Sequence, residues 1–131
     1  MTFKFSDRSW ERIRSCDPEL QAIVVRCMSY QIMDIIVLEG HRSPERQAKL
    51  LEQGKTQVRW SKHNENPSHA IDIAPWPIDW DCRDRFHVLG GLMQAAAKER
   101  GATLRWGGDW DQDGDTRDNR FDDLVHFELT S

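Results

Sequence analysis

The sequence predicts an α+β fold, a small antiparallel sheet with helices packed on it. Apolar residues recur at helical spacing through much of the first half of the chain, which favours helices there. Four short segments have the β-branched or alternating composition of strands, and helices and loops separate them. The 131 residues, 38% of them hydrophobic, are enough to bury one core. We therefore expect a single domain over residues 1–131.

Capping residues mark the starts of three helices. A hydroxyl or carboxyl side chain that caps the first turn, with proline at the first helical position, is typical of a helix start. The caps are Ser6, Asp17 before Pro18, and Ser43 before Pro44. In the third helix we expect Ala48, Leu50 and Leu51 to face the core, and we expect Gly54 to end the helix.

The remaining elements follow from the apolar pattern and from glycine and proline. Residues 84–100 carry apolar residues at helical spacing and are followed by Gly101, which predicts a fourth helix. The predicted strands are residues 33–38, 70–74, 103–106 and 126–129. We expect Pro75 to stop the second strand, and we expect residues 55–69, which have no periodic pattern, to form a loop.

Charge and hydropathy exclude several classes of function. The net charge is −4, and residues 109–123 alone hold seven aspartates against two arginines. The chain has no basic patch of the kind that binds nucleic acid. It has no apolar run near the roughly 20 residues that span a bilayer, and its N-terminus lacks the apolar core of a signal peptide. We expect no nucleic-acid partner, no stable membrane association, and synthesis in the cytoplasm.

The three cysteines, Cys16, Cys27 and Cys82, are odd in number and show no paired spacing. This pattern favours reduced thiols in the core over disulfides or metal ligands.

Two segments of the second half each place a histidine near a carboxylate. His63 lies nine residues before Asp72, and Asp123 lies three residues before His126. Two imidazoles and one carboxylate are the ligand number of a catalytic zinc, which leaves one position open for water, and the second carboxylate remains to handle protons. Taken alone, His63 also fits an ordinary surface histidine, and Asp123 fits one more member of the acidic segment.

These motifs, Ser61-Lys62-His63, Ala70-x-Asp72 and Asp123-x-x-His126-Phe127-Glu128, resemble the M15 family of zinc peptidases. Within it the chain resembles the phage endolysins that act as L-alanyl-D-glutamate endopeptidases, with the hedgehog/DD-peptidase fold. The resemblance runs from Gly40 through the Trp106–Trp110 region to Leu129. It implies Zn²⁺ held by His63, Asp72 and His126. It also implies Asp123 as general base and Arg42 as a contact to substrate or transition state.

Each implied role has a competitor in the sequence. Arg42 can hold a carboxylate or an oxyanion with its planar fork, or it can pair with a neighbouring acid. Ser61 can bind substrate or cap a turn. Asp122 competes with Asp123 as the base, and His69 competes as a metal ligand. Glu128 alternates with His126 along a predicted strand, so it is expected on the same face, where it can orient that histidine.

The chain departs from the usual family pattern, Ser-x-His-x-x-Gly-x-Ala-x-Asp, by two additional residues between His63 and Asp72. The intervening loop, with Pro67 and Ser68 near the usual glycine, must therefore bulge differently. The acid at position 123 is aspartate, as in the endopeptidase branch, whereas the carboxypeptidases usually carry glutamate there.

The acidic segment has the opening pattern of a calcium loop. Aspartates occupy every second position, at Asp109, Asp111, Asp113 and Asp115, and Gly114 lies between the last two. The twelfth position is Arg120, where such loops carry a bidentate glutamate, so a complete EF-hand is not expected. A looser Ca²⁺ site that orders the segment before Asp123 is the alternative to a solvated loop.

Together with the resemblance, these features predict a monomeric zinc endopeptidase. The resemblance implies that it cuts the stem peptides of peptidoglycan, with L-Ala–D-Glu as the first-choice bond. We expect no separate wall-binding domain, and we expect access to the cell wall only after another protein permeabilises the membrane. A D-alanyl-D-alanine carboxypeptidase shares the metal site and competes with this interpretation. So do a non-catalytic zinc-binding recognition domain on the same fold and a histidine-metal nuclease.

Overall fold

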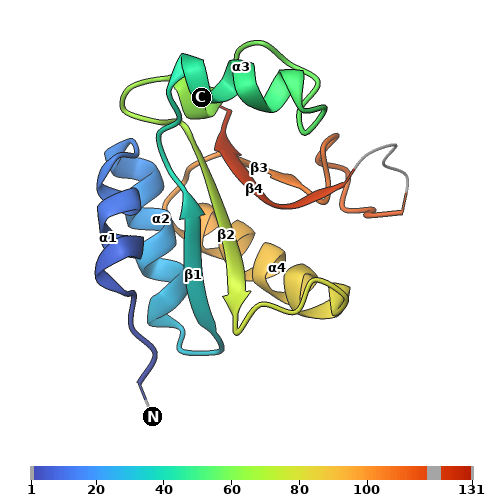
Figure 1. Ribbon diagram of the computed structural model, residues 1–131. Helices are drawn as coiled ribbons and strands as arrows, with labels where there is room; N and C mark the ends of the chain where they lie inside the picture. Colours follow the sequence, from blue (N-terminus) through green and yellow to red (C-terminus); the bar gives the residue numbers. More distant parts are fainter. Residues whose placement is uncertain (1, 118–121, 131) are drawn as a thin grey trace.

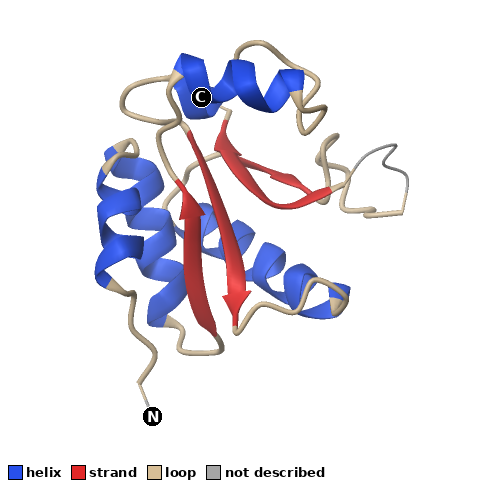
Figure 2. Cartoon of the chain, viewed as in Figure 1, coloured by secondary structure: helices blue, strands red, loops and turns tan. Residues whose placement is uncertain are grey.

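The computed structural model describes residues 2–117 and 122–130, and its elements are shown in Figures 1 and 2. In chain order the elements are α1 (Asp7–Arg14), α2 (Pro18–Ser29), β1 (Asp34–Glu39), α3 (Pro44–Glu52), the short 3₁₀ helix η1 (Lys62–Asn64), β2 (Ala70–Trp76), α4 (Arg83–Glu99), β3 (Leu104–Gly107) and β4 (Asp123–Leu129). The fold is α+β, as the sequence predicts.

The four strands form one antiparallel sheet in the order β1-β2-β4-β3. α2 packs against both α1 and α4, while α1 contacts β1 and α4 contacts the other three strands, so these helices cover one face of the sheet. α3 stands apart from them, near the end of the sheet where β1 finishes and β2 begins (Figure 1). The core lies between the sheet and the three helices. Its fully buried members include Ile13, Leu20, Ile71, Ile73, Leu89, Met93 and Phe127.

The predicted caps are confirmed. The side chains of Ser6, Asp17 and Ser43 each accept a hydrogen bond from a backbone N–H in the first turn of their helix, at 3.1, 2.8 and 3.1 Å. Each such cap contributes about 1 kcal/mol to helix stability. Gly101 ends α4 with a φ of 71°, a left-handed conformation that glycine adopts without strain.

The predicted inward face of α3 is wrong in one position. Ala48 is exposed, whereas Gln47 is fully buried, and Leu51 is only half-buried beside the buried Leu50. The reason is that α3 does not pack on the apolar core. Gln47 instead accepts a hydrogen bond from Arg42 and donates one to the carbonyl of Val58, so a polar network holds this helix.

The observed end of β2, the observed start of β4 and one loop also differ from the predictions. β2 continues through Pro75, which pairs with Ile35 of β1. β4 pairs with β2 only at residues 70–72, so in the described chain the missing N–H of Pro75 removes no bond to β4. The stretch 55–69, expected to be loop throughout, includes η1.

β4 begins at Asp123, three residues earlier than predicted. Asp123 pairs with Gly107 next to a register shift in β3. A side chain at position 107 would overlap the backbone of Asp123, so glycine permits this close approach. Asp123 is therefore held in place by strand pairing, as part of the sheet rather than of a loop.

Within the described residues, no helix combines the length and the apolar composition needed to cross a membrane.

Candidate active site

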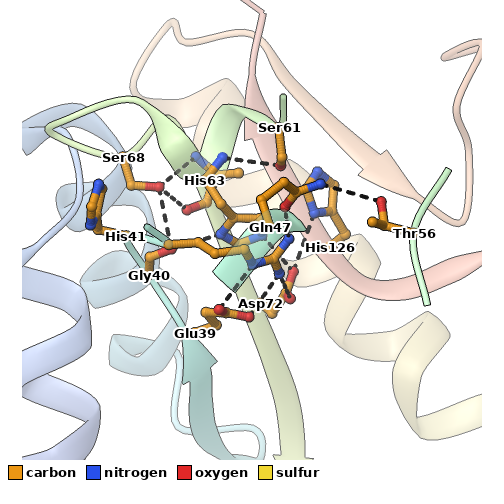
Figure 3. Close-up of polar contacts among 12 residues, drawn as sticks. Glu39, Gly40, His41, Gln47, Thr56, Ser61, His63, Ser68, Asp72 and His126 are labelled. Carbon is orange, nitrogen blue, oxygen red and sulfur yellow. Dashed lines mark hydrogen bonds and ion pairs between the residues drawn. The ribbon is translucent and has the colours of Figure 1, made fainter. Parts of the chain in front are cut away.

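Three side chains that are distant in sequence converge on one point. His63 comes from η1, Asp72 from β2 and His126 from β4, where Asp72 and His126 are direct cross-strand partners. Asp72 Oδ1 lies 3.0 Å from His63 Nε2 and 3.2 Å from His126 Nδ1, and each of the three residues offers a potential ligand atom within 4.8 Å of the other two. Figure 3 shows the two imidazoles meeting the carboxylate of Asp72.

The local structure fixes the orientation of His63. The Ser61 side chain and Asn64 form a capping box around η1, which holds this turn, and the His63 side chain is almost completely buried. His63 Nδ1 lies 2.7 Å from the carbonyl oxygen of Gly40. A carbonyl only accepts, so Nδ1 carries the proton, and in the neutral ring the lone pair is on Nε2 and faces Asp72.

His126 is held in the same manner through its other nitrogen. Its Nε2 lies 2.8 Å from Glu128 Oε1, and an ionised carboxylate only accepts hydrogen bonds, so Nε2 carries the proton. In the neutral ring the lone pair of Nδ1 therefore faces Asp72 as well. Glu128 is almost fully buried beside His126. It lies on the same face of the strand as this histidine, as the sequence predicts.

This arrangement needs a cation. Two imidazole lone pairs and a carboxylate oxygen repel one another at these distances unless positive charge stands between them. Protons can supply it: burial opposes the charged form of His126, but Asp72 and Glu128 outweigh burial and raise the pKa of His126 to about 9. Burial opposes the ionised form of Asp72 too, yet the two histidines hold the pKa of that carboxyl far below its usual range. A metal ion can replace the protons, and two nitrogens with one oxygen suit it.

Arg42 lies beside this cluster and is already paired. Its Nε and one terminal nitrogen donate to the two carboxylate oxygens of Glu39 at 2.9 and 2.7 Å, and its other terminal nitrogen donates to Gln47 at 2.8 Å. The guanidinium also lies 3.6 Å from Asp72 Oδ2. Burial lowers the pKa of Arg42, but Glu39 and the nearby aspartates outweigh burial and raise it. Arg42 therefore forms the ion pair with a neighbouring acid that the sequence offered as the alternative to a substrate contact.

Ser61 also has a structural contact. Its hydroxyl oxygen accepts a hydrogen bond from the backbone N–H of His63 at 3.2 Å, which is the turn-capping role. Ser61 nevertheless lines the same cavity as His63, Asp72 and His126.

The two candidate bases, Asp123 and Asp122, lie in different surroundings. Asp123 lines the cavity, and its carboxyl is close enough to Asp72 and His126 for their charges to affect it. Burial and the charge of Asp72 together raise the pKa of Asp123 above its ordinary value. Asp122 forms an ion pair with Arg83 at 2.6 Å instead.

His69 lies outside the cluster. Its ring contacts Glu65, and its Nε2 lies 3.5 Å from Asp17 Oδ2. The longer loop before β2 docks on the junction of α1 and α2, where Ser68 exchanges backbone hydrogen bonds with Ser15 and Asp17. The two additional residues are accommodated by this docking, and Asp72 still reaches His63.

In the acidic segment Asp109, Asp111 and Asp113 bring carboxylate oxygens within 4.8 Å of one another. Asp109 is buried and accepts a hydrogen bond from the N–H of Gly114 at 2.9 Å. Asp115 pairs with Arg117 at 3.1 Å and is not a member of this group. Arg120, which argues against an EF-hand, lies outside the described residues.

A cavity of about 870 Å³ opens over the cluster. Asp72, Asp123 and His126 line it, and its rim carries the tryptophans Trp60, Trp80 and Trp110. Sequence reasoning missed several lining or supporting residues, namely Glu39, Gln47, Trp60 and Arg105. Of these, Glu39 had a usable signal, because an acid three residues before Arg42 is placed to pair with it.

Comparisons with known proteins identify the family of the chain. A sequence model of the family described as phage L-alanyl-D-glutamate peptidase matches residues 1–130. The chain belongs to this family. It is 31% identical over 122 residues to the L-alanyl-D-glutamate peptidase of Escherichia phage T5, an alignment that covers 90% of this chain and 89% of the relative.

The crystal structure of the Serratia marcescens L-Ala D-Glu endopeptidase ChiX has the same fold. The TM-score is 0.81 at 29% identity, and the match covers 98% of this chain and 91% of that one. The chain, as a member of the phage L-alanyl-D-glutamate peptidase family, is therefore a peptidase. Its resemblance to endolysins is confirmed.

Proposed function

We propose that this protein is an endopeptidase that hydrolyses the L-Ala–D-Glu bond in the stem peptides of peptidoglycan, with zinc as its metal. The observation that carries the proposal is the convergence of His63, Asp72 and His126 in the wall of a large cavity. Family membership supports the peptidase activity and the substrate class.

His63 Nε2, His126 Nδ1 and Asp72 Oδ1 are the atoms that hold the metal in this proposal. Three ligands leave a position open for water. When bound there, zinc acts as a Lewis acid and lowers the pKa of its water to about 7. The Gly40 carbonyl and Glu128 hold the two rings with their free lone pairs toward that position, so the site is ordered before metal arrives.

Asp123 is the proposed general base. Its carboxylate takes a proton from the attacking water and delivers it to the nitrogen that departs with D-glutamate. The start of β4 places it within electrostatic reach of the three ligands. Asp122 cannot substitute, because it is paired with Arg83.

Arg42 is proposed to bind the carbonyl oxygen as negative charge develops on it. Glu39 and Gln47 fix the guanidinium, and the terminal nitrogen bound to Glu39 also faces Asp72. The second N–H of the terminal nitrogen bound to Gln47 is therefore the proposed donor to the substrate oxygen. Ser61, held as a turn cap on the same cavity, is the proposed second contact to the peptide.

The proposal includes a single copy of the chain as the active form. It also includes synthesis in the cytoplasm, with access to peptidoglycan after membrane permeabilisation. Sedimentation at assay concentrations tests the monomer.

The decisive experiment is mass spectrometry of defined muropeptides after digestion. We expect free disaccharide-L-Ala and a peptide that begins with D-Glu, no products after chelation, and recovery with added Zn²⁺. Asp123→Asn should abolish cleavage, whereas the adjacent Asp122→Asn serves as the matched control and should retain it. Release of D-Ala alone would establish a carboxypeptidase instead. Zinc binding without any product would establish a recognition domain.

A calcium site at Asp109, Asp111 and Asp113 is a separate proposal, supported by their convergence just before β4. Calcium should raise the thermal stability of the metal-loaded enzyme and raise its activity. Titration that changes neither quantity removes this site from the proposal.

A further inference from the structure

We propose that Arg105 and Lys62 form a carboxylate subsite in the wall of the cavity, which selects stem peptides whose D-glutamate has a free α-carboxylate. This inference rests on the proposed function and adds the part of the substrate that the chain recognises beside the scissile bond.

Arg105 is positioned by the sheet. It lies on β3 directly opposite Glu128 of β4, and one terminal nitrogen donates to Glu128 Oε2 at 2.8 Å. Its guanidinium also lies over the ring of Trp110, 5.6 Å from the ring centre. Trp110 in turn packs against His126. Two contacts therefore hold the cation next to a proposed metal ligand.

Among the residues that the structure describes, most donors of this guanidinium have no hydrogen-bond partner. Arg105 Nε is buried and has no hydrogen-bond partner within residues 2–117 and 122–130. Of the five N–H groups of the side chain, one bonds Glu128 in this part of the chain. The buried Nε cannot reach a ligand, but the side chain as a whole is 38% exposed and lines the cavity, so its terminal nitrogens are the proposed donors.

Lys62 adds a second cation from η1. Its Nζ donates to the carbonyl of Leu129 at 2.5 Å and lies 3.9 Å from Glu128 Oε2. Like Arg105 it is partly exposed and lines the cavity. The same carboxylate is thus flanked by two cations from different elements.

The charges do not balance. Glu128 carries one negative charge and already accepts a hydrogen bond from His126, yet both Arg105 and Lys62 face it. Holding Glu128 against His126 requires at most one of these cations. The cavity is lined by five cations, Arg42, Arg46, Lys55, Lys62 and Arg105, and by four acids, Glu39, Asp72, Asp123 and Glu128, so one positive charge is in excess.

The substrate supplies a matching anion. In the stem peptide, D-glutamate continues the chain through its side-chain carboxyl, so its α-carboxylate is free. That group is attached to the carbon that bears the departing nitrogen. Arg105 and Lys62 line the same cavity as His126, so an α-carboxylate that they hold shares this cavity with the departing nitrogen. Charge-assisted hydrogen bonds to a carboxylate are among the stronger recognition contacts.

The test compares two synthetic peptides, N-acetyl-L-Ala-γ-D-Glu-L-Lys-amide and the same peptide with D-isoglutamine, which amidates the α-carboxylate. The zinc-loaded wild type should cleave the free carboxylate with a kcat/KM roughly 10- to 100-fold higher. Arg105→Gln and Lys62→Gln should each reduce this ratio toward one, and Arg105→Lys should retain part of it. Arg46→Gln, another cationic position on the same cavity, is the matched control and should keep the wild-type ratio.

A purely positioning role for Arg105 lowers cleavage of both peptides equally and leaves the ratio unchanged. An unchanged ratio in both glutamine variants, or equal cleavage of the two peptides by the wild type, overturns the subsite and leaves the proposed function intact. Cleavage of neither peptide by the wild type overturns the proposed function, and the subsite with it.

Discussion

Two adjacent glycines in the middle of α4, Gly90 and Gly91, should respond oppositely to the same substitution. Gly90 is buried against the indole of Trp106, and a Cβ built there lies 2.5 Å from the ring. Gly91 is exposed, and a Cβ there meets nothing within 4 Å. The pair therefore separates a steric effect from a backbone effect within one helix.

The expected magnitudes follow from these distances. Alanine is more favourable than glycine inside a helix by about 1 kcal/mol, and this gain is common to both positions. At position 90 the ring must also move by about 1 Å to reach ordinary contact, and overpacking of this kind costs roughly 1–3 kcal/mol. Gly91→Ala should stabilise the protein by about 1 kcal/mol, whereas Gly90→Ala should be neutral or destabilising by up to about 2 kcal/mol.

Trp106 cannot move freely, because its Nε1 donates to the carbonyl of Leu124 at 2.9 Å and its ring stacks on Phe127. Both partners lie on β4 beside His126, so Gly90→Ala should also reduce activity. Urea unfolding followed by far-ultraviolet circular dichroism measures the free energy of unfolding of both variants. Equal stabilisation by the two substitutions would refute the packing argument.

Three further predictions concern the site and the thiols. Zinc at about 1,000 times its Kd should stabilise the metal-free protein by about 4 kcal/mol, measured by thermal unfolding, and His126→Ala should lose this effect; an equal shift in the variant would place the metal elsewhere. Burial, followed by the charge of Asp72, raises the pKa of Asp123 in the metal-free folded protein, so its ionised form opposes folding. Asp123→Asn should therefore raise the free energy of unfolding above that folded-state pKa, and the gain should vanish below the ordinary value of 3.8; a gain that persists at lower pH would contradict the argument. Burial raises the pKa of the Cys16 and Cys27 thiols to about 12, so a thiol reagent at about pH 8 should modify the partly exposed Cys82 first; rapid labelling of all three in the native state would contradict it.

Local elements were predictable because their signals are local. The caps Ser6, Asp17 and Ser43 act on N–H groups within three residues, so the helix starts needed no tertiary information. The predicted inward face of α3 failed for the opposite reason. Gln47 is buried by Arg42 and by Val58, a residue eleven positions away, and no periodic pattern carries that contact.

The sheet decided the position of the proposed base. The sequence places Asp123 and Asp122 side by side in an acidic run, with nothing local to separate them. Pairing with Gly107 puts the first at the start of β4 and in the cavity, while Arg83 from α4 takes the second.

By itself the sequence determined the fold class, the helix starts and the residue types for a metal site, because capping and hydrophobic periodicity act over a few residues. Only the tertiary structure decided that His63, Asp72 and His126 meet, that His69 does not, and that Arg105 and Lys62 share Glu128. These relations depend on strand register and loop docking, which bring together residues as far apart in the chain as Lys62 and Glu128.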